Sequence, residues 1–277
     1  MELKTFFTLY DISGKVTVVT GGAGILCTTI SRVLAAAGMK VAILDLNLPA
    51  AESLAAEIRS NGGEAISVAC NVQEKSSVES AAQEVMGSFG QVDNLINGAG
   101  GNKPQATIHP DQSFFDLPID EQRWVIDLNL IGTILPSQVF GQVMAQQKQG
   151  NIINISSMNA FRPLTRIPAY SAAKAAVSNF TQWLAVHMAL EYSPDIRVNA
   201  IAPGFILTDQ NRFLLTDKET GDLSPRGKSI IDHTPMRRFG TPDDLLGTVF
   251  WMISPASAFI TGVVVPVDGG FSVYSGV

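Results

Sequence analysis

Residues 16–47 are the stretch that decides the fold, and they read VTVVTGGAGILCTTISRVLAAAGMKVAILDLN. The short apolar runs Val16–Val19 and Val41–Leu44 are typical of buried parallel strands. Between them, the Ala-rich run Ala23–Ala37 favours a helix that stops at Gly38. A strand, a glycine-rich turn and a helix in this order leave backbone N–H groups free at a helix N-terminus. The stretch therefore predicts a βαβ unit that can hold an anionic group such as a pyrophosphate.

The alternation of short apolar runs with longer helical patterns continues along the whole chain, as in a parallel sheet covered by helices. The predicted strands are Val16–Val19, Val41–Leu44, Ala65–Ala69, Leu95–Ile96, Ile152–Ile155, Val198–Ile201 and Val263–Val267. The predicted helices are Ala23–Ala37, Pro49–Ser60, Glu74–Phe89, Ile119–Gln149, Pro168–Glu191 and Thr241–Ile253, and the stretches Gly101–Pro118 and Phe205–Phe239 are predicted to be irregular. We therefore expect an α/β fold of the Rossmann type, with a doubly wound seven-stranded parallel sheet and helices on both faces, in a single domain spanning residues 1–277.

An acidic residue, Asp45, ends the second predicted strand about twenty residues after the turn Thr20–Gly24. A carboxylate at this position accepts a hydrogen bond from the 2′-hydroxyl of an adenosine ribose and repels a 2′-phosphate. A glycine-rich turn alone is weak support for dinucleotide binding, but its strand–turn–helix context strengthens the prediction. Together the turn and the acid predict NAD(H), rather than NADP(H), as the cofactor.

A second informative stretch runs from Ser157 to Lys174 and holds a hydroxyl, a phenol and an ammonium. Tyr170 and Lys174 are four residues apart in an Ala-rich segment, so on a helix they lie on one face. Ser157 follows an apolar run that we interpret as a buried strand, and ligands bind at the carboxyl ends of such strands. A cation beside a phenol brings the pKa of tyrosine from about 10 toward neutral pH. The same pair also fits an ordinary helix surface, so proton-transfer chemistry needs support from the rest of the chain.

The composition favours a small-molecule partner over nucleic acid or a membrane. The net charge is −6 and no run of Lys and Arg is present, unlike a nucleic-acid surface. His109, His187 and His233 are far apart, so the sequence predicts no metal site. Cys27 and Cys70 lie in apolar segments, as buried thiols do, and no apolar run approaches the ~18 residues of a membrane span. We therefore expect a cytoplasmic protein.

Taken together, these motifs resemble the short-chain dehydrogenase/reductase family over nearly the whole chain. The matching residues, in the family's order and spacing, are Thr20–Gly21, Asn97–Gly98–Ala99–Gly100, Asn129, Ser157, Tyr170, Lys174, Pro203–Gly204 and Asp268–Gly269–Gly270. The resemblance implies an NAD-dependent dehydrogenase or reductase that acts on a CH–OH group, with the nicotinamide carrying the hydride.

The resemblance also implies roles for individual residues. Tyr170 exchanges a proton with the reacting oxygen, and Ser157 holds that oxygen. Lys174 binds the nicotinamide ribose and lowers the pKa of Tyr170, while Asn129 supports a proton relay. The cofactor is expected to contact Gly21, Gly24, Ile25, Asp45, Asn71, Val72, Asn97, Ala99, Gly100, Tyr170, Lys174, Pro203, Gly204 and Thr208. Asn71 stands where the family usually has Asp, and the segment 205–239 resembles the family's substrate lid.

The chain departs from the family at the glycine-rich turn. The usual pattern is Thr-Gly-x-x-x-Gly-[Ile/Leu]-Gly, and Ile25 and Cys27 stand where the last two glycines belong. Those glycines permit close backbone approach and tight packing of the helix on the strand. Gly24 is placed to substitute through a small shift of the turn, and Cys27 is small enough to pack. The departure also leaves open a second function, a dinucleotide-sensing binding protein without turnover.

Four longer segments, 97–102, 113–117, 156–166 and 264–272, resemble the branch of this family that reduces the hexuronate D-fructuronate to D-mannonate with NADH. A sugar acid needs a partner for its carboxylate, and a planar guanidinium binds a carboxylate through two hydrogen bonds. We expect Arg162 to fill this role because it lies between Ser157 and Tyr170. The other candidate substrate-binding residues are Asn102, Asn159 and Arg212, with Lys103, Arg166, Gln210 and Asn211 nearby in the sequence.

Related substrates and another reductase class stay open from the sequence. A gluconate 5-dehydrogenase-like or 2-keto-3-deoxygluconate-type enzyme would differ from a D-fructuronate reductase only in the details of its substrate pocket. A carrier-bound acyl reductase is expected to prefer NADP(H) and to carry a basic docking patch, and Asp45 and the acidic balance argue against it. The family resemblance further implies a homotetramer, with helices Ile119–Gln149 and Pro168–Glu191 packed between subunits.

Overall fold

A central sheet of seven parallel strands organises the molecule, with the strand order β3-β2-β1-β4-β5-β6-β7. The structure is a computed structural model that describes residues 3–109, 112–208, 212–217 and 220–276. The strands are β1 Val16–Thr20, β2 Lys40–Asp45, β3 Glu64–Ala69, β4 Asn94–Asn97, β5 Gly150–Ile155, β6 Ile196–Pro203 and β7 Val264–Val267. The chain order reverses between β1 and β4, which makes the carboxyl ends of these two strands the switch point of the sheet.

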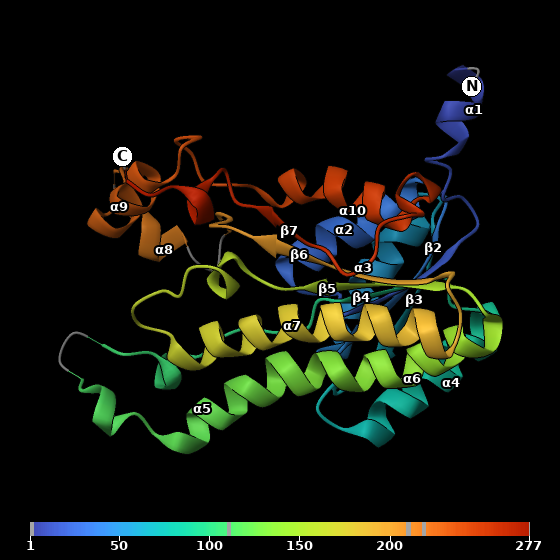
Figure 1. Ribbon diagram of the computed structural model, residues 1–277, viewed down its shortest axis with the longest axis horizontal. Helices are drawn as coiled ribbons and strands as arrows, with labels where there is room; N and C mark the ends of the chain where they lie inside the picture. Colours follow the sequence, from blue (N-terminus) through green and yellow to red (C-terminus); the bar gives the residue numbers. More distant parts are fainter. Residues whose placement is uncertain (1–2, 110–111, 209–211, 218–219, 277) are drawn as a thin grey trace.

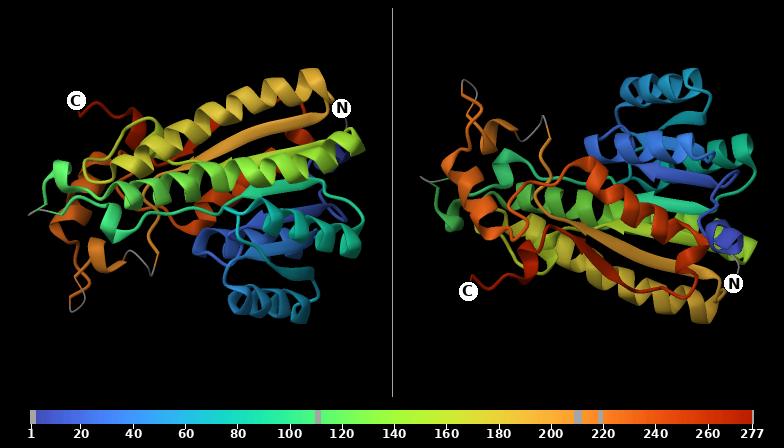
Figure 2. Two further views of the ribbon diagram at one scale, coloured as in Figure 1. Left: turned by 90° about the horizontal axis from the view of Figure 1, so that it is seen from below. Right: turned by 90° about the horizontal axis from the view of Figure 1, so that it is seen from above.

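Helices cover both faces of this sheet (Figure 1). The helices are α1 Leu3–Thr8, α2 Ile25–Ala36, α3 Leu48–Ser60, α4 Lys75–Phe89, α5 Ile119–Ile126, α6 Gly132–Gln147, α7 Pro168–Glu191, α8 Arg212–Leu215, α9 Pro225–His233 and α10 Leu246–Ile253. One face carries α2, α3 and α10, and the other carries α4, α6 and α7. Figure 2 shows α6 and α7 running alongside each other on the outside of their face. The expected fold class is therefore confirmed.

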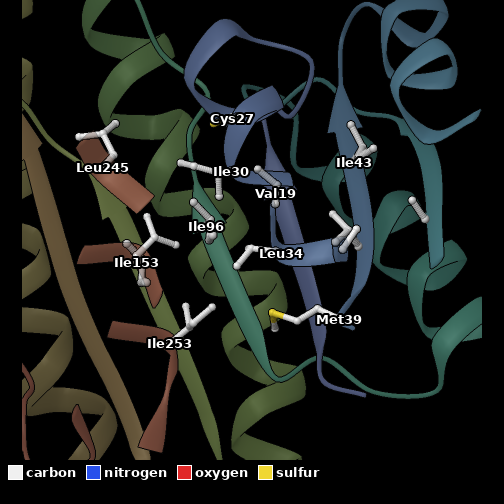
Figure 3. Close-up of a cluster of buried hydrophobic side chains, with 14 of the residues drawn as sticks. Val19, Cys27, Ile30, Leu34, Met39, Ile43, Ile96, Ile153, Leu245 and Ile253 are labelled. Carbon is white, nitrogen blue, oxygen red and sulfur yellow. The ribbon is translucent and has the colours of Figure 1, made fainter. Parts of the chain in front are cut away.

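The two cores follow from the alternation of side chains along each buried strand. On β2, Val41 and Ile43 belong to the core on the side of α2, α3 and α10, whereas Ala42 and Leu44 belong to the core on the side of α4, α6 and α7. Figure 3 shows the first core, whose labelled residues include Ile43 of β2 together with Ile30 and Leu34 of α2. Both faces of the strands are buried, which explains why the sequence shows continuous apolar runs rather than a polar alternation.

The predicted helix Ile119–Gln149 is wrong as one continuous α-helix. It consists of α5, a π-helical segment Asp127–Ile131 and α6. The side-chain amide of Asn129 donates to the Val125 carbonyl at 2.8 Å, the acceptor that the Asn129 backbone N–H would use in an α-helix. Pro136 further removes one N–H from the first turns of α6. The bulge is therefore stabilised at the position that carries Asn129.

The stretch Phe205–Phe239 is not wholly irregular, contrary to the prediction, since it contains α8 and α9. Ser224 is the N-cap of α9, and its hydroxyl accepts from the Gly227 N–H at 3.0 Å. Pro225 is the first residue of the helix. Ser at the N-cap and Pro at the first position are a helix start signal. Residues 209–211 and 218–219 of this stretch lie outside the described ranges. Across the described part of the chain, no helix combines the length and the apolar character needed to cross a membrane.

Candidate functional site

The segments that carry the predicted site residues meet at the carboxyl edge of the sheet. They are the turn after β1, the loop 97–101 after β4, the residues after β5 and the residues after β6. Helices α8 and α9 and the long loop after β4 extend from this same end of the molecule, at the left of Figure 1. This edge includes the switch point, where open α/β sheets bind their ligands.

The turn after β1 is built to receive an anion. Gly21 adopts a φ of 59°, which a glycine tolerates without strain. Gly24 is the N-cap of α2, and its N–H donates to the Gly21 carbonyl at 2.9 Å. Among the described residues, no acceptor meets the N–H groups of Ile25, Leu26 and Cys27. These free donors, together with the helix dipole, suit a pyrophosphate, so the residues present fit a dinucleotide.

Asp45 lies at the end of β2 and braces this turn. Its Oδ2 accepts from the Ala23 N–H at 3.0 Å, and its Oδ1 accepts from the Asn47 N–H at 2.8 Å. The sequence placed Asp45 beside the turn but gave no sign that it holds the turn in place. The carboxylate therefore fixes the backbone of the glycine-rich turn, and its predicted contact with a ribose 2′-hydroxyl stays a prediction.

The loop after β4 packs directly on the glycine-rich turn. The Thr20 hydroxyl accepts from the N–H groups of Gly98 and Ala99 at 3.2 and 3.3 Å. A Cβ added to Gly21 would lie 2.7 Å from the Ala99 Cα, so the close approach requires glycine there. Asn97 is buried and donates to Ser137 and Asn154 at 2.9 and 2.8 Å. The predicted residues Gly21, Asn97 and Ala99 thus form one rigid framework.

Ser157 and Tyr170 face each other. Ser157 follows β5, and its hydroxyl accepts from the Asn159 N–H at 3.3 Å. Burial raises the pKa of Tyr170, and a hydrogen bond with Ser157 partly opposes that shift. A hydroxyl pair beside the end of a strand can grip and protonate a carbonyl oxygen.

Lys174 is buried one helical turn after Tyr170. Its Nζ donates to the Ile155 carbonyl at 2.7 Å and lies 5.6 Å from the centre of the Tyr170 ring. Burial lowers the pKa of Lys174 to about 8. The expected lowering of the Tyr170 pKa by Lys174 is not what this structure has, because desolvation of the phenol outweighs its other interactions and raises that pKa.

Asn129, fully buried in the π-helical segment, holds the loop after β4. Its Oδ1 accepts from the Gly101 N–H at 3.1 Å, and its Nδ2 donates to the Gly101 carbonyl at 2.7 Å. A Cβ on Gly100 would lie 2.7 Å from the Asn129 Oδ1 and 3.2 Å from the Lys174 Nζ. Asn129, Gly100 and Lys174 therefore meet at one point.

Other expected cofactor residues lie at the same edge with local partners of their own. The Asn71 amide donates to Glu74 at 2.8 Å and its Oδ1 accepts from the Gln73 N–H at 3.1 Å, so this side chain shapes the turn before α4. Val72 is buried and packs against Gly132. After Pro203 at the end of β6, the Gly204 N–H donates to the Val267 carbonyl at 3.0 Å. The Thr208 carbonyl accepts from the Arg212 N–H at 2.9 Å.

The candidate substrate residues differ in how far they are already engaged. Arg162 is exposed, and its Nε donates to the Ser272 carbonyl at 3.0 Å. Lys103 forms an ion pair with Glu121 and lies 4.4 Å from the centre of the Trp124 ring, which makes it a poor candidate for a free carboxylate partner. Asn102 donates to the Thr107 hydroxyl at 2.8 Å, and Asn159 is buried beside Ser157. Arg212 lies on α8, Arg166 is exposed before α7, and Gln210 and Asn211 lie outside the described residues.

A feature that the sequence did not reveal is an apolar cluster beside this site. It joins Met158 after Ser157, Leu215 and Ile230 of the expected lid, and Phe271 near the C-terminus. Phe271 packs edge-on against the Phe205 ring at 5.1 Å. In the sequence, the cluster was indicated only by apolar residues such as Leu215 and Ile230 within the expected lid. Their partners Met158 and Phe271 are distant in the sequence and meet them only in the folded structure.

Comparisons with known proteins agree with this geometry. A family model described as enoyl-(acyl carrier protein) reductase matches residues 23–272. An uncharacterized oxidoreductase of Bacillus subtilis, UxuB, is 48% identical over 96% of this chain and 98% of its own length. An uncharacterized oxidoreductase of Haemophilus influenzae is 46% identical over 97% of this chain and 96% of its own length.

Among solved structures, a Haemophilus influenzae protein provisionally assigned as a D-mannonate oxidoreductase was determined with bound NAD. It superimposes with a TM-score of 0.90 at 46% identity and covers 96% of this chain and 98% of that one. The bound NAD of that protein agrees with the cofactor predicted here from the turn and Asp45.

Proposed function

The chain belongs to the short-chain dehydrogenase/reductase family of NAD-dependent oxidoreductases, and within that family we propose that it reduces the keto group of D-fructuronate to give D-mannonate. The observation that carries the choice of substrate is the 46% identity, over nearly the full length, to the protein provisionally assigned as a D-mannonate oxidoreductase. The site geometry supports the oxidoreductase chemistry independently of that assignment.

In the proposed reaction, bound NADH supplies the hydride, and the chain supplies the proton and the orientation. The Ser157 hydroxyl donates to the substrate carbonyl oxygen, and the Tyr170 phenol transfers its proton to that oxygen. The raised pKa of Tyr170 keeps the phenol protonated at neutral pH, which suits a proton donor in reduction. Lys174 holds the nicotinamide ribose, and Asn129 keeps the loop after β4 in place beside Lys174.

We assign the substrate carboxylate to Arg162. Its Nε is occupied by the Ser272 carbonyl, and among the described residues this is the guanidinium's only hydrogen-bond partner, so Nη1 and Nη2 remain available. A guanidinium oriented through one donor loses less entropy when its other donors bind a carboxylate. Arg162 also lies five residues after Ser157, on the segment that joins β5 to α7.

A panel of keto acids, assayed with NADH and NADPH in parallel, tests the substrate. We expect the highest kcat/KM with D-fructuronate and NADH. Higher activity with 5-ketogluconate or with a keto-deoxygluconate would replace the substrate and keep the oxidoreductase assignment. NADH binding in titration without turnover of any compound would instead support a dinucleotide-sensing protein, the alternative that Ile25 and Cys27 motivate.

We further propose a homotetramer in the cytoplasm. No Asp, Glu, Lys or Arg occurs between residues 128 and 147 or between 175 and 190, which cover all of α6 and much of α7. These two helices line a hollow of about 410 Å³ that includes Phe180, Trp183 and Tyr192. An outer face without charges is typical of a surface that another subunit covers. The free, buried thiols Cys27 and Cys70 support a reducing compartment.

A further inference from the structure

The thiol of Cys27 occupies the space beside Gly98. Cys27 lies in the first turn of α2, is only 4% exposed and belongs to the core between α2 and the sheet (Figure 3). A Cβ built on Gly98 would overlap its Sγ, so the two positions cannot both carry a side chain in this arrangement. Gly98 does not adopt a positive φ, so its φ does not by itself require glycine.

The neighbouring contacts fix the distance between the two loops. Gly21 lies against Ala99, and the Thr20 hydroxyl holds the N–H groups of both Gly98 and Ala99. The first loop offers the free N–H groups that face a pyrophosphate, and the second leads to Gly100, which touches Asn129 and Lys174. A shift of one loop against the other would move the pyrophosphate site relative to the ribose site.

We propose that Cys27 and Gly98 form a complementary pair, in which the absence of a side chain at position 98 makes room for the thiol at position 27, so that Cys27 positions the β4 loop for NAD(H). In the usual pattern of the family, the counterpart of Cys27 is a glycine. Because that glycine has no side chain, the helix can pack closely on the sheet. Here the close approach is kept because the glycine lies on the opposite side of the contact. Ile25, which replaces the other glycine, is accommodated differently, since Gly24 ends the turn and Ile25 begins α2.

The chemistry of a thiol suits this role. A buried Cys behaves as a small apolar side chain, and burial raises the pKa of Cys27 to about 12, so it stays neutral beside Asp45 and Lys174. A larger side chain would push the β4 loop outward, and a smaller one would leave a void that the loop could relax into. The proposal concerns cofactor binding and is independent of which keto acid is reduced.

The test measures the NADH dissociation constant and the Tm of five proteins: wild type, Cys27→Gly, Gly98→Ala, the double variant and Gly87→Ala. Gly87 lies in α4 with no atom within 4 Å of an added Cβ, so it is the matched control and should leave the dissociation constant unchanged. We expect Gly98→Ala to weaken NADH binding about 10-fold or more, and Cys27→Gly only about 3-fold. The double variant should bind NADH about 5-fold or more tightly than Gly98→Ala, with rescue incomplete because the Thr20 carbonyl lies 2.9 Å from the added Cβ.

A second pair of variants keeps the test decisive if Gly98→Ala does not fold. Cys27→Val adds a branched side chain against an unchanged Gly98 and should weaken NADH binding about 5-fold or more, whereas Cys27→Ala should stay within about 3-fold of wild type. All dissociation constants are measured well below each Tm. Equal dissociation constants for Cys27→Val and wild type, or a lower Tm with unchanged NADH affinity, would overturn the positioning role. Additive effects in the double variant would do the same.

Discussion

Tyr170 is the residue on which turnover should depend most. Replacing it with Phe removes the transferable proton and little else, so we expect kcat to fall about 10²–10⁴-fold, the range for general acid catalysis. NADH affinity, measured by titration, should be nearly unchanged, because the ring and its packing remain. A Tyr170→Phe protein with a kcat near wild type would remove Tyr170 from the mechanism.

Lys174 should lower the stability of the folded protein, because its ammonium is buried at the site. Its pKa falls from the ordinary value to about 8, so between about pH 8 and pH 10.4 the unfolded chain binds more protons than the folded one, and stability rises with pH. Below pH 8 the full penalty is present. We therefore expect Lys174→Met to raise the free energy of unfolding by roughly 1–3 kcal/mol at pH 7, an advantage that shrinks toward pH 10.

Denaturant unfolding of both proteins at pH 7 and pH 10 checks this expectation. In parallel, Lys174→Met should weaken NADH binding, because its ammonium is proposed to hold the nicotinamide ribose. A variant that is less stable than wild type at pH 7 would contradict the burial penalty, and one with unchanged NADH affinity would remove the ribose role.

At the scale of elements, Asp45 couples the end of β2 to the glycine-rich turn. Asp45→Asn removes the charge but keeps an oxygen that can accept from a backbone N–H, whereas Asp45→Ala removes both interactions with the turn. We expect both variants to bind NADPH better relative to NADH, since the charge repulsion is gone. Only Asp45→Ala should also weaken NADH markedly. The dissociation constants of each variant for NADH and NADPH test this prediction. A wild-type protein that already prefers NADPH would contradict the role assigned to Asp45.

Arg162 joins the segment after β5 to the C-terminal segment through Ser272. Replacing it with alanine should lower kcat/KM for the sugar acid, by an amount that corresponds to a loss of roughly 2–4 kcal/mol in transition-state stabilisation, because a charge-assisted partner of the carboxylate is lost. The affinity for NADH should stay constant. Arg162→Lys should restore only part of the lost kcat/KM, since the point charge of an ammonium cannot reproduce the two parallel hydrogen bonds of a guanidinium. Arg166→Ala is the comparison, and a larger loss there would move the carboxylate to Arg166.

The strands could be read from the sequence because they are buried on both faces and carry continuous apolar runs. The π-helical segment could not, because it depends on the Asn129 side chain taking the Val125 carbonyl, and nothing in the apolar periodicity marks that bond. Helix α9 was missed although Ser224 and Pro225 mark its start, since its surroundings are polar and rich in turn residues.

For the whole site, motif spacing brought Ser157, Tyr170 and Lys174 together correctly, because their spacing follows from one strand end and one helix face. The surroundings of each group could not be predicted from sequence spacing. Desolvation of Tyr170 depends on what packs around it, and the pairing of Lys103 with Glu121 depends on two loops meeting. Sequence spacing therefore predicts which groups converge, and the fold decides their protonation and their partners.

At the scale of the whole molecule, the charge-free face of α6 and α7 predicts the assembly. Trp183 is 57% exposed there and stacks on His187 at 4.8 Å between ring centres. A stable interface typically buries about 1,200–2,000 Å², and a charge at its centre loses its water without gaining a partner. We expect Trp183→Glu to dissociate the tetramer, measured as molar mass by light scattering after size-exclusion chromatography. Gln83→Glu, which adds the same charge on the exposed side of α4, should keep the wild-type mass. An unchanged mass for Trp183→Glu would place the subunit contact elsewhere, because a buried glutamate facing its own symmetry copy is incompatible with an intact apolar interface.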